Sequence, residues 1–274
     1  MLSRTSRRHV IITLVSFVLL LMFSVSAVAD VLLPEASGTK VKRDGSLTVD
    51  CSHMDEGYIM VKGPVSKKRL KVRIKTASVT LNYDLNTTGE YEVYPLQFGS
   101  GKYQVALYKN ASGNKYSEEG KVTINADMDN ELSCFLYPNQ YVNYGADSIA
   151  VKNAADICQG MTNDTDKFEA VCGYMKANFQ YDFIKSVTVT QGTMPDIDGT
   201  IQKRMGICQD LAAVMVCMLR SQGIPARLMI GTVGSSNYHA WVTAVVDGKD
   251  VFFDPTAELN ASPRDQQYTT ERYY

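Results

Sequence analysis

The sequence predicts an α+β protein in which an all-β region precedes a mixed region of helices and an antiparallel sheet. Three observations support this order. Short alternating segments separated by Gly, Asn and Ser occupy residues 41–128. Apolar residues at helical spacing follow from about residue 147, and a strand–turn–strand pattern lies at about 238–253. The 274 residues leave room for two modest domains, which we expect at 30–128 and 129–274.

The first 29 residues have the pattern of a targeting segment. Three arginines precede a nearly continuous apolar run at 10–23, and the small residues Ala27-Val28-Ala29 end it. This pattern predicts a cleaved signal peptide at 1–29 and hence a secreted or cell-surface protein. An uncleaved membrane anchor is the alternative, because residues 10–29 form a stretch of 20 that just spans a bilayer. Removing three arginines and no acidic residue changes the formal net charge from −1 to −4, which argues against a nucleic-acid partner.

Residues 41–128 have the pattern of β-strands throughout. Candidate strands lie at 46–50, 58–62, 70–75, 78–83, 89–96, 102–109 and 120–126. Their lengths and spacings are typical of a sandwich, and we expect an immunoglobulin-like β-sandwich here. The preceding segment 31–40, which contains Pro34 and Gly38, is expected to be a short linker.

Seven Lys and Arg residues lie between positions 62 and 75. From residue 70 to 75 they alternate with apolar residues, which places the charges on one face of a strand. One interpretation is a solvated edge strand whose charges prevent aggregation. The other is a contact, through Lys67–Lys75, for an anionic cell-wall polymer or a membrane surface.

The second half of the chain changes to helical periodicity. Helices are expected at about 147–158 and about 162–179, each with apolar residues three or four apart. Cys158 and Cys172 could form a disulfide if these two helices pack antiparallel. The loop 187–200 follows and is expected to wall a cleft.

A further helix is expected from Cys208 to about Gln222, because apolar residues recur at helical spacing and Gly223 and Pro225 end it. Cys208 therefore lies at the N-terminus of this helix. There, unpaired amides and the helix dipole favour a thiolate over a thiol. The same amides can donate to an oxyanion that develops on a substrate.

Cys208, His239 and Asp254 are the residue types that nucleophilic chemistry requires. A thiol needs a base to take its proton, and the base needs an acceptor that fixes its tautomer. Histidine occurs only at positions 9, 53 and 239, and the first of these lies in the targeting segment. Taken singly, the three residues have ordinary interpretations: a small core residue, a surface histidine and a strand exit. Together, in this order, they favour a catalytic triad.

His239 and Asp254 are expected on a β-hairpin whose turn contains Asp247-Gly248. If Val246 and Asp247 form a type I turn with Gly248 as a bulge, His239 and Asp254 face each other directly. A tight two-residue turn at Asp247-Gly248 instead leaves them diagonal on one face of the sheet.

The residues around this triad resemble the transglutaminase-like superfamily, a branch of the papain-like cysteine enzymes. The resemblance covers about residues 148–258. It rests on four blocks in order: Gly-Ile-Cys-Gln-Asp-Leu-Ala at 206–212, Leu-Arg-Ser-Gln-Gly-Ile-Pro-Ala-Arg at 219–227, His-Ala-Trp at 239–241 and Asp-Pro-Thr at 254–256. It implies a papain-like α+β fold with Cys208 as nucleophile, His239 as base and Asp254 as the residue that orients the base. Asp250 departs from the family pattern, which often has an aromatic residue there, and this alters the expected cleft wall.

The resemblance also implies candidates around the triad. A Gln side chain often completes the oxyanion hole in papain-like enzymes, so Gln202 and Gln191 are candidates here, although a surface position is the ordinary interpretation of each. Gln209, beside the nucleophile, contributes its backbone amide. Tyr238 and Trp241, the only Trp, are candidates for the cleft. Trp241 is expected either to shield the His–Asp pair from water or simply to pack in the core.

The sequence as a whole predicts an exported cysteine acyltransferase or hydrolase. We expect thiolate attack on an amide carbonyl, a thioester at Cys208, and transfer of the acyl group to an amine or to water. Gln-containing proteins or peptides, or cell-wall peptides, are the expected partners. No metal or organic cofactor is expected, since no spacing of Cys or His is typical of a metal site. A cysteine peptidase is one alternative, and a non-catalytic binding or scaffold module is another of a different class.

Overall fold

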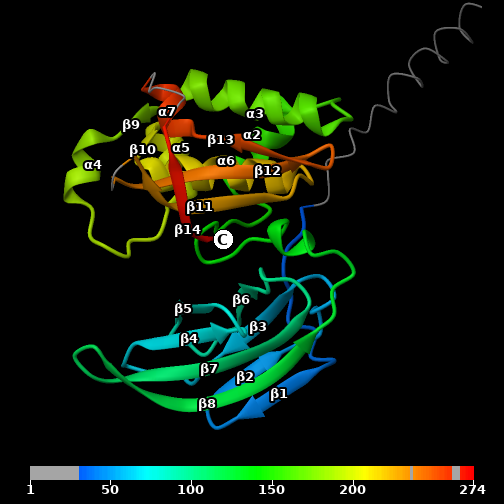
Figure 1. Cartoon of the computed structure of the whole chain (residues 1–274), viewed down its shortest axis with the longest axis vertical. Helices are drawn as coiled ribbons and strands as arrows, with labels where there is room; N and C mark the ends of the chain where they lie inside the picture. The colour runs from blue at the N-terminus through cyan, green and yellow to red at the C-terminus, as the bar shows by residue number, and fades with distance from the viewer. Residues whose placement is uncertain (1–30, 235–236, 261–265) are drawn as a thin grey trace, which may run out of the picture.

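The computed structural model describes residues 31–234, 237–260 and 266–274. Figure 1 shows β-sheets alone in the N-terminal part and helices packed around a further sheet in the C-terminal part. The expectation of an α+β protein is therefore confirmed. The expected signal peptide lies outside the described residues. Within the described residues, no helix is long and apolar enough to cross a membrane.

Two four-stranded antiparallel sheets form the N-terminal region, with the orders β1-β2-β3-β6 and β5-β4-β7-β8. The strands are β1 Val41–Asp44, β2 Leu47–Asp50, β3 Tyr58–Lys62, β4 Leu70–Lys75, β5 Thr80–Leu85, β6 Glu92–Pro95, β7 Gly101–Ser112 and β8 Lys115–Ala126. Alternation along β4 turns Val72 and Ile74 toward a core that they share with Leu47 and Val49 of the other sheet. Each predicted strand has a counterpart, whereas β1 was not predicted because its sequence, Val-Lys-Arg-Asp, has no apolar alternation.

The basic residues of β4 lie on its outer face, as the alternation predicts. However, β4 is paired on one side with β5 and on the other with β7, so the interpretation as an edge strand is wrong. Lys71 pairs with Asp84 of β5 at 2.8 Å, and Arg73 donates to the side chain of Asn82 at 3.0 Å. Two of the basic residues of β4 are therefore engaged by polar side chains on the neighbouring strand β5.

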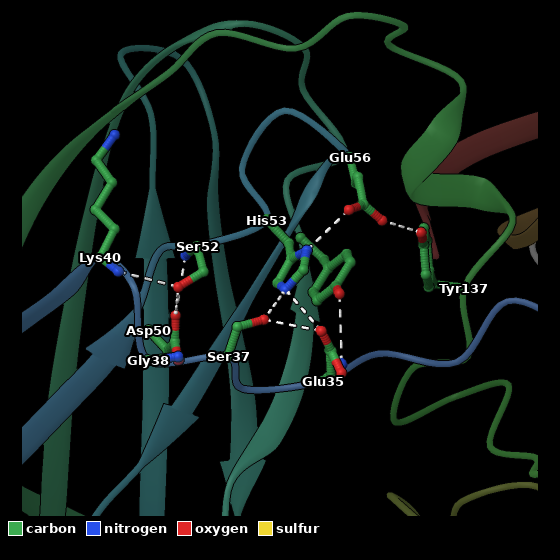
Figure 2. A network of polar contacts seen from close by, with 10 residues as sticks. Glu35, Ser37, Gly38, Lys40, Asp50, Ser52, His53, Glu56 and Tyr137 are labelled. Carbon is green, nitrogen blue, oxygen red and sulfur yellow. Dashed lines mark hydrogen bonds and ion pairs between the residues drawn. The ribbon is translucent and has the colours of Figure 1, made fainter.

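The segment before β1 is bound to the sheets by a polar network, so the expectation of a linker at 31–40 is wrong (Figure 2). His53 Nδ1 lies 2.8 Å from Glu56 Oε1, and His53 Nε2 hydrogen-bonds the hydroxyl of Ser37. The other carboxylate oxygen of Glu56 accepts the hydroxyl of Tyr137, which belongs to the connector after β8. One His–Glu pair thus ties both the incoming segment and the connector to the same end of the sheets.

The C-terminal region is an antiparallel sheet of order β13-β12-β11-β14 with helices packed on it. Its strands are β11 Ala226–Val233, β12 Asn237–Val246, β13 Lys249–Phe253 and β14 Tyr268–Tyr273. Its helices are α2 Ile149–Ile157, α3 Asp164–Asn178, α4 Phe183–Thr188, α5 Ile197–Lys203, α6 Cys208–Ser221 and α7 Pro255–Leu259. The smaller elements are the 3₁₀ helix η1 Ser133–Phe135 and the parallel pair β9 Gln180–Tyr181 and β10 Met205–Gly206. The three longer helices lie where the periodicity predicts them.

Helix α6 is the central element of this region. It packs against β11 and β12 and against α2, α3 and α5. Every residue from Asp210 to Ser221 is buried. Its first residue, Cys208, is half-buried at the end that reaches the surface. The core therefore holds the thiol on a rigid support.

None of the cysteines is oxidised. All six are free, and five of them are buried. The disulfide considered for Cys158 and Cys172 is therefore not formed. Burial raises the pKa of both thiols, which keeps them in the unreactive form.

Arg220, in the last turn of α6, is buried among backbone oxygens. Its guanidinium donates to Ala226 at 2.9 Å, to Tyr137 at 2.7 Å and to Tyr274 at 3.0 Å. Arg220→Met is therefore expected to lower the free energy of unfolding by about 3 kcal/mol or more, because three buried acceptors lose a charged donor. Urea unfolding followed by circular dichroism measures this change.

The matched control for Arg220 is Lys152→Met. The partner of Lys152, Asp147, is fully exposed, and surface ion pairs contribute little. The control should unfold at the wild-type urea concentration. If the two variants unfolded at the same midpoint, the three contacts of Arg220 would not stabilise the fold.

The end of β14 lies between the two regions of the protein. Tyr273 donates its hydroxyl to the backbone oxygen of Gln97 at 3.3 Å. The ring of Tyr274 stacks on Tyr141 with centroids 3.7 Å apart and meets Tyr83 edge-on at 5.8 Å. This strand therefore contacts the N-terminal sheets while it pairs with β11.

Candidate active site

Cys208 is the first residue of α6, and a buried carboxylate fixes the start of this helix. Asp210 Oδ2 accepts the backbone N–H of Ile207 at 3.0 Å and pairs with Lys185 Nζ at 2.6 Å. The backbone N–H groups of Cys208 and Gln209 are the first two of the helix, so no carbonyl of a preceding helical turn accepts a hydrogen bond from them. They can therefore bind an anion that forms beside the thiol.

The hairpin of β12 and β13 has a tight two-residue turn. Val246 pairs with Lys249, and both turn residues have positive φ, 48° at Asp247 and 75° at Gly248. These angles are typical of a type I′ turn, whose twist matches that of the strands. The three-residue turn, which would place His239 directly opposite Asp254, is therefore wrong, and the diagonal arrangement is the one found.

His239 lies between the other two candidate residues. Its Nε2 is 2.7 Å from Asp254 Oδ2, and Cys208 lies close enough to the ring to raise its pKa. Because the carboxylate engages Nε2, Nδ1 is the ring nitrogen that remains available to the thiol. The structure thus brings Cys208, His239 and Asp254 together.

The carboxylate of Asp254 is buried and fully engaged. Besides His239, it accepts the hydroxyl of Tyr268 at 2.7 Å and the backbone N–H groups of Thr256 at 2.9 Å and Ala257 at 3.0 Å. Burial alone would raise the pKa of Asp254. The hydrogen bond and charge of His239, with the other donors, outweigh burial and hold this pKa below its usual value. Asp254 therefore remains an anion that faces Nε2.

A cleft of 650 Å³ opens over Cys208, and residues 189–193 of the expected loop line it. Gln191 and Gln209 are among the lining residues. The side chain of Gln209 donates to the backbone oxygen of Thr193 at 2.9 Å, so it braces this loop. Gln202 is exposed on α5 and does not line the cleft. Among the residues that the structure describes, no cluster of His, Cys, Asp and Glu could hold a metal ion.

Two aromatic residues flank His239 on β12. Tyr238 lines the cleft and is 57% exposed. Trp241 is 2% exposed, and its ring lies nearly parallel to that of His239 with centroids 6.3 Å apart. Trp241 therefore packs in the core and at the same time covers one side of the imidazole.

Residues 152–255 match the family described as the transglutaminase-like superfamily. The matched segment is therefore similar to that superfamily. It contains Cys208, His239 and Asp254, and it agrees with the expected span of about 148–258.

Individual proteins are also similar to parts of this chain. The uncharacterized protein YebA of Bacillus subtilis is 30% identical over 123 residues, which are 38% of this chain and 17% of that protein. The chain thus spans about a sixth of the length of this relative. A structure from Cytophaga hutchinsonii, described as a candidate cysteine protease, is 16% identical, with a TM-score of 0.40 and coverage of 86% of this chain and 90% of that one. The periplasmic domain of TgpA from Pseudomonas aeruginosa is 14% identical, with a TM-score of 0.38 and coverage of 83% and 78%.

The imidazole of the transglutaminase-like segment favours its protonated form. Burial acts to lower the pKa of His239. The hydrogen bonds to Asp254 and Cys208, together with their charges, outweigh burial and raise the pKa to about 9. His239 is therefore held as an imidazolium near neutral pH.

A pH dependence follows from this protonation. The raised pKa means that the proton on His239 stabilises the folded protein fully below the ordinary value of 6.5, and that this stabilisation is lost as the pH rises through about 9. The rate of any reaction that takes a proton from His239 is expected to fall above pH about 9 for the same reason, because the imidazole is then no longer protonated. A pH–rate profile measures this limb. A fall in rate centred near pH 6.5 would show that Asp254 and Cys208 do not raise the pKa of His239.

Some residues of this site escaped the sequence analysis. Asp210 lies in the motif around Cys208, and an acid at the third position of a helix is a recognised capping signal. Its partner Lys185, on α4, carries no such signal. Tyr268 follows the family segment and belongs to no motif. Only the three-dimensional fold brings Lys185 to Asp210 and Tyr268 to Asp254.

Proposed function

We propose that this protein is an exported cysteine enzyme that acts on amide bonds through a thioester at Cys208. The observation that supports this most is the position of His239. It is hydrogen-bonded to Asp254 and close enough to Cys208 for that residue to raise its pKa, beside a 650 Å³ cleft in the transglutaminase-like segment. Gln-containing proteins, peptides or cell-wall peptides are the substrates that we propose.

The acylation step uses the proton on His239. The thiolate of Cys208 attacks the carbonyl carbon of the amide, and the carbonyl oxygen becomes an oxyanion. The amides of Cys208 and Gln209 donate to it. The carbon–nitrogen bond then breaks, the leaving amine takes the proton from Nδ1 of His239, and a thioester remains.

The second step runs the proton transfer in reverse. An acceptor amine or water gives a proton to Nδ1 of His239 while its nitrogen or oxygen attacks the thioester carbon. The carbon–sulfur bond breaks and the thiolate of Cys208 is restored. Asp254 stays ionised throughout and orients the imidazole. The acceptor alone decides whether the reaction is cross-linking or hydrolysis.

Mass spectrometry can decide between these reactions. The mature chain is incubated with a glutamine-rich protein and a labelled primary amine, with Cys208→Ala as control. Incorporation of the amine at Gln would identify a transglutaminase, whereas new peptide termini without the amine would identify a peptidase. If neither occurred, and iodoacetamide at pH 6 alkylated Cys208 no faster than free cysteine, the protein would be a non-catalytic binding module.

We further propose that residues 30–128 form an immunoglobulin-like domain and 129–274 the catalytic domain. The strand order supports this proposal. The strands β2-β3-β6 in one sheet and β5-β4-β7-β8 in the other correspond to A-B-E and C′-C-F-G of immunoglobulin-type sandwiches. Limited proteolysis between β8 and α2 should release two folded fragments.

The basic stretch Lys67–Lys75 is proposed to contact an anionic polymer of the cell envelope. This proposal is supported by exposure, because four of the basic side chains face solvent: Lys67, Lys68, Arg73 and Lys75. Binding of the mature chain to isolated envelopes should weaken in 0.5 M salt, because salt at about this concentration screens exposed charges within a few ångströms. Binding that does not change with salt would exclude this contact.

A further inference from the structure

The C-terminal strand β14 reaches the active site although it lies outside the family segment. The match to the superfamily ends at residue 255, whereas β14 begins at Tyr268 and pairs with β11 at the edge of the sheet (Figure 1). The hydroxyl of Tyr268 donates to Asp254 Oδ2 at 2.7 Å. The same oxygen is 2.7 Å from Nε2 of His239. A residue beyond the family motif thus shares an oxygen with the candidate base.

The hydroxyl of Tyr268 completes the coordination of this carboxylate. An ionised carboxylate offers about four lone-pair sites. Oδ1 uses its two for the backbone N–H groups of Thr256 and Ala257. Oδ2 uses its two for His239 and Tyr268. Backbone donors therefore fix one oxygen of Asp254, and side-chain donors fix the other.

Packing of aromatic rings holds the ring of Tyr268 in place. It meets the rings of Trp241 and Phe252 edge-on, with centroids 5.1 Å and 4.8 Å apart. Its centroid lies 6.2 Å from that of the His239 ring. Burial and the charge of Asp254 raise the pKa of Tyr268, so the hydroxyl remains a donor over the whole working range of pH. The ring therefore aims a permanent donor at the carboxylate.

A glycine on β11 allows β14 to come this close. Gly231 pairs with His239 on one side, and on the other a Cβ at Gly231 would lie 1.9 Å from the backbone oxygen of Thr269. The ladder between β11 and β14 shifts by one residue at this point. Close approach at Gly231 thus places Tyr268 within reach of Asp254.

We propose that Tyr268 is a positioning residue, which holds Asp254 Oδ2 in line with Nε2 of His239 and offsets part of the charge on that oxygen. Its effect on turnover rests on the proposed function, whereas its effect on the His–Asp pair does not. The hydrogen of the hydroxyl points at Oδ2, so it weakens the negative potential that the imidazolium feels. Without it, His239 should hold its proton more tightly and return it more slowly to the leaving amine.

The test compares Tyr268→Phe with Tyr273→Phe. Both remove one hydroxyl from β14, but Tyr273 donates to Gln97 and not to Asp254. Proton NMR follows the titration of His239, with His53 as the second imidazole of the mature chain. Tyr268→Phe should move the midpoint of His239 upward by about half a pH unit or more. Tyr273→Phe should leave it unchanged.

Kinetics on a glutamine-containing peptide with a labelled amine give the second readout. Tyr268→Phe should lower kcat about tenfold and change KM by less than about twofold, because the hydroxyl does not touch substrate. If His239 titrated with the same midpoint pH in Tyr268→Phe and Tyr273→Phe, the proposal would be overturned. If wild-type protein turned over no amide at all, the titration would still test Tyr268 while the proposed function itself failed.

A fluorinated residue covers the case in which Tyr268→Phe does not fold. 3-Fluorotyrosine at position 268 keeps the ring and the hydroxyl but makes the hydroxyl a stronger donor. The midpoint of His239 should then move downward, opposite to the effect of Phe. No shift, or an upward shift, would contradict the proposal.

Discussion

Replacement of Cys208 by alanine is expected to lower kcat by on the order of 10⁵–10⁶-fold, which is the scale on which loss of a nucleophile acts in triad enzymes. No other described thiol can substitute for it, because the other five are buried. The fold should persist, since Cys208 is only half-buried and packs against the core from the first position of α6, whereas the buried residues that anchor this helix begin at Asp210. Initial rates and urea unfolding of the same preparation measure both effects.

Two further measurements sharpen the test of Cys208. Its hydrogen bond and charge help to raise the pKa of His239, so Cys208→Ala should bring this pKa below about 9. Cys217→Ala is the matched control, on the same helix but fully buried. It should retain activity and lose about 1 kcal/mol of stability through a small cavity. Turnover retained in Cys208→Ala would overturn the assignment of the nucleophile.

Much of the fold follows from local patterns in the sequence. Alternation of apolar and charged residues over 70–75 predicts β4 and its outer face, because a strand turns successive side chains to opposite sides. Spacing of apolar residues predicts α6, and Gly223 marks its end with a positive φ of 81°. Two of the triad candidates are also local signals, since Cys208 begins that helix and Asp254 directly follows a strand.

The parts that could not be predicted depend on contacts between distant segments. The inner position of β4 follows from its pairing with β7, which lies about thirty residues later. The turn at Asp247-Gly248 requires positive φ at both residues, and an aspartate there is compatible with more than one turn. Tyr268 reaches Asp254 only because β14 returns along β11. No local pattern contains this information.

Asp254→Asn is the second change expected to have a large effect, and the reason lies in the neighbours of the carboxylate. All four groups that contact it are donors: the amides of Thr256 and Ala257, the imidazolium of His239 and the hydroxyl of Tyr268. An asparagine has one oxygen and one NH₂ group. Whichever way it turns, its NH₂ group faces two donors. Asparagine therefore cannot replace aspartate here, although the two have the same shape.

The consequences of Asp254→Asn fall on rate, pH profile and stability together. With the NH₂ group toward His239, the imidazole takes the wrong tautomer, and kcat should fall by on the order of 10⁴-fold. Loss of the carboxylate removes the hydrogen bond that does most to raise the pKa of His239, together with its negative charge, so the alkaline limb should move from about 9 toward 6.5. With the NH₂ group toward the start of α7, two buried amides lose their acceptor, and stability should fall by about 1–3 kcal/mol.

Asp250→Asn on β13 is the matched control for this change. The side chain of Asp250 is 66% exposed and pairs with Arg227 at 3.0 Å, so it is a carboxylate on the strand that leads to Asp254 but lacks a buried set of donors. It should leave the rate, the alkaline limb and the stability near those of the wild type. If Asp254→Asn kept the wild-type alkaline limb, Asp254 would not govern the protonation of His239. In that case only its role at the start of α7 would remain, because the two backbone amides bind Oδ1 independently of the imidazole.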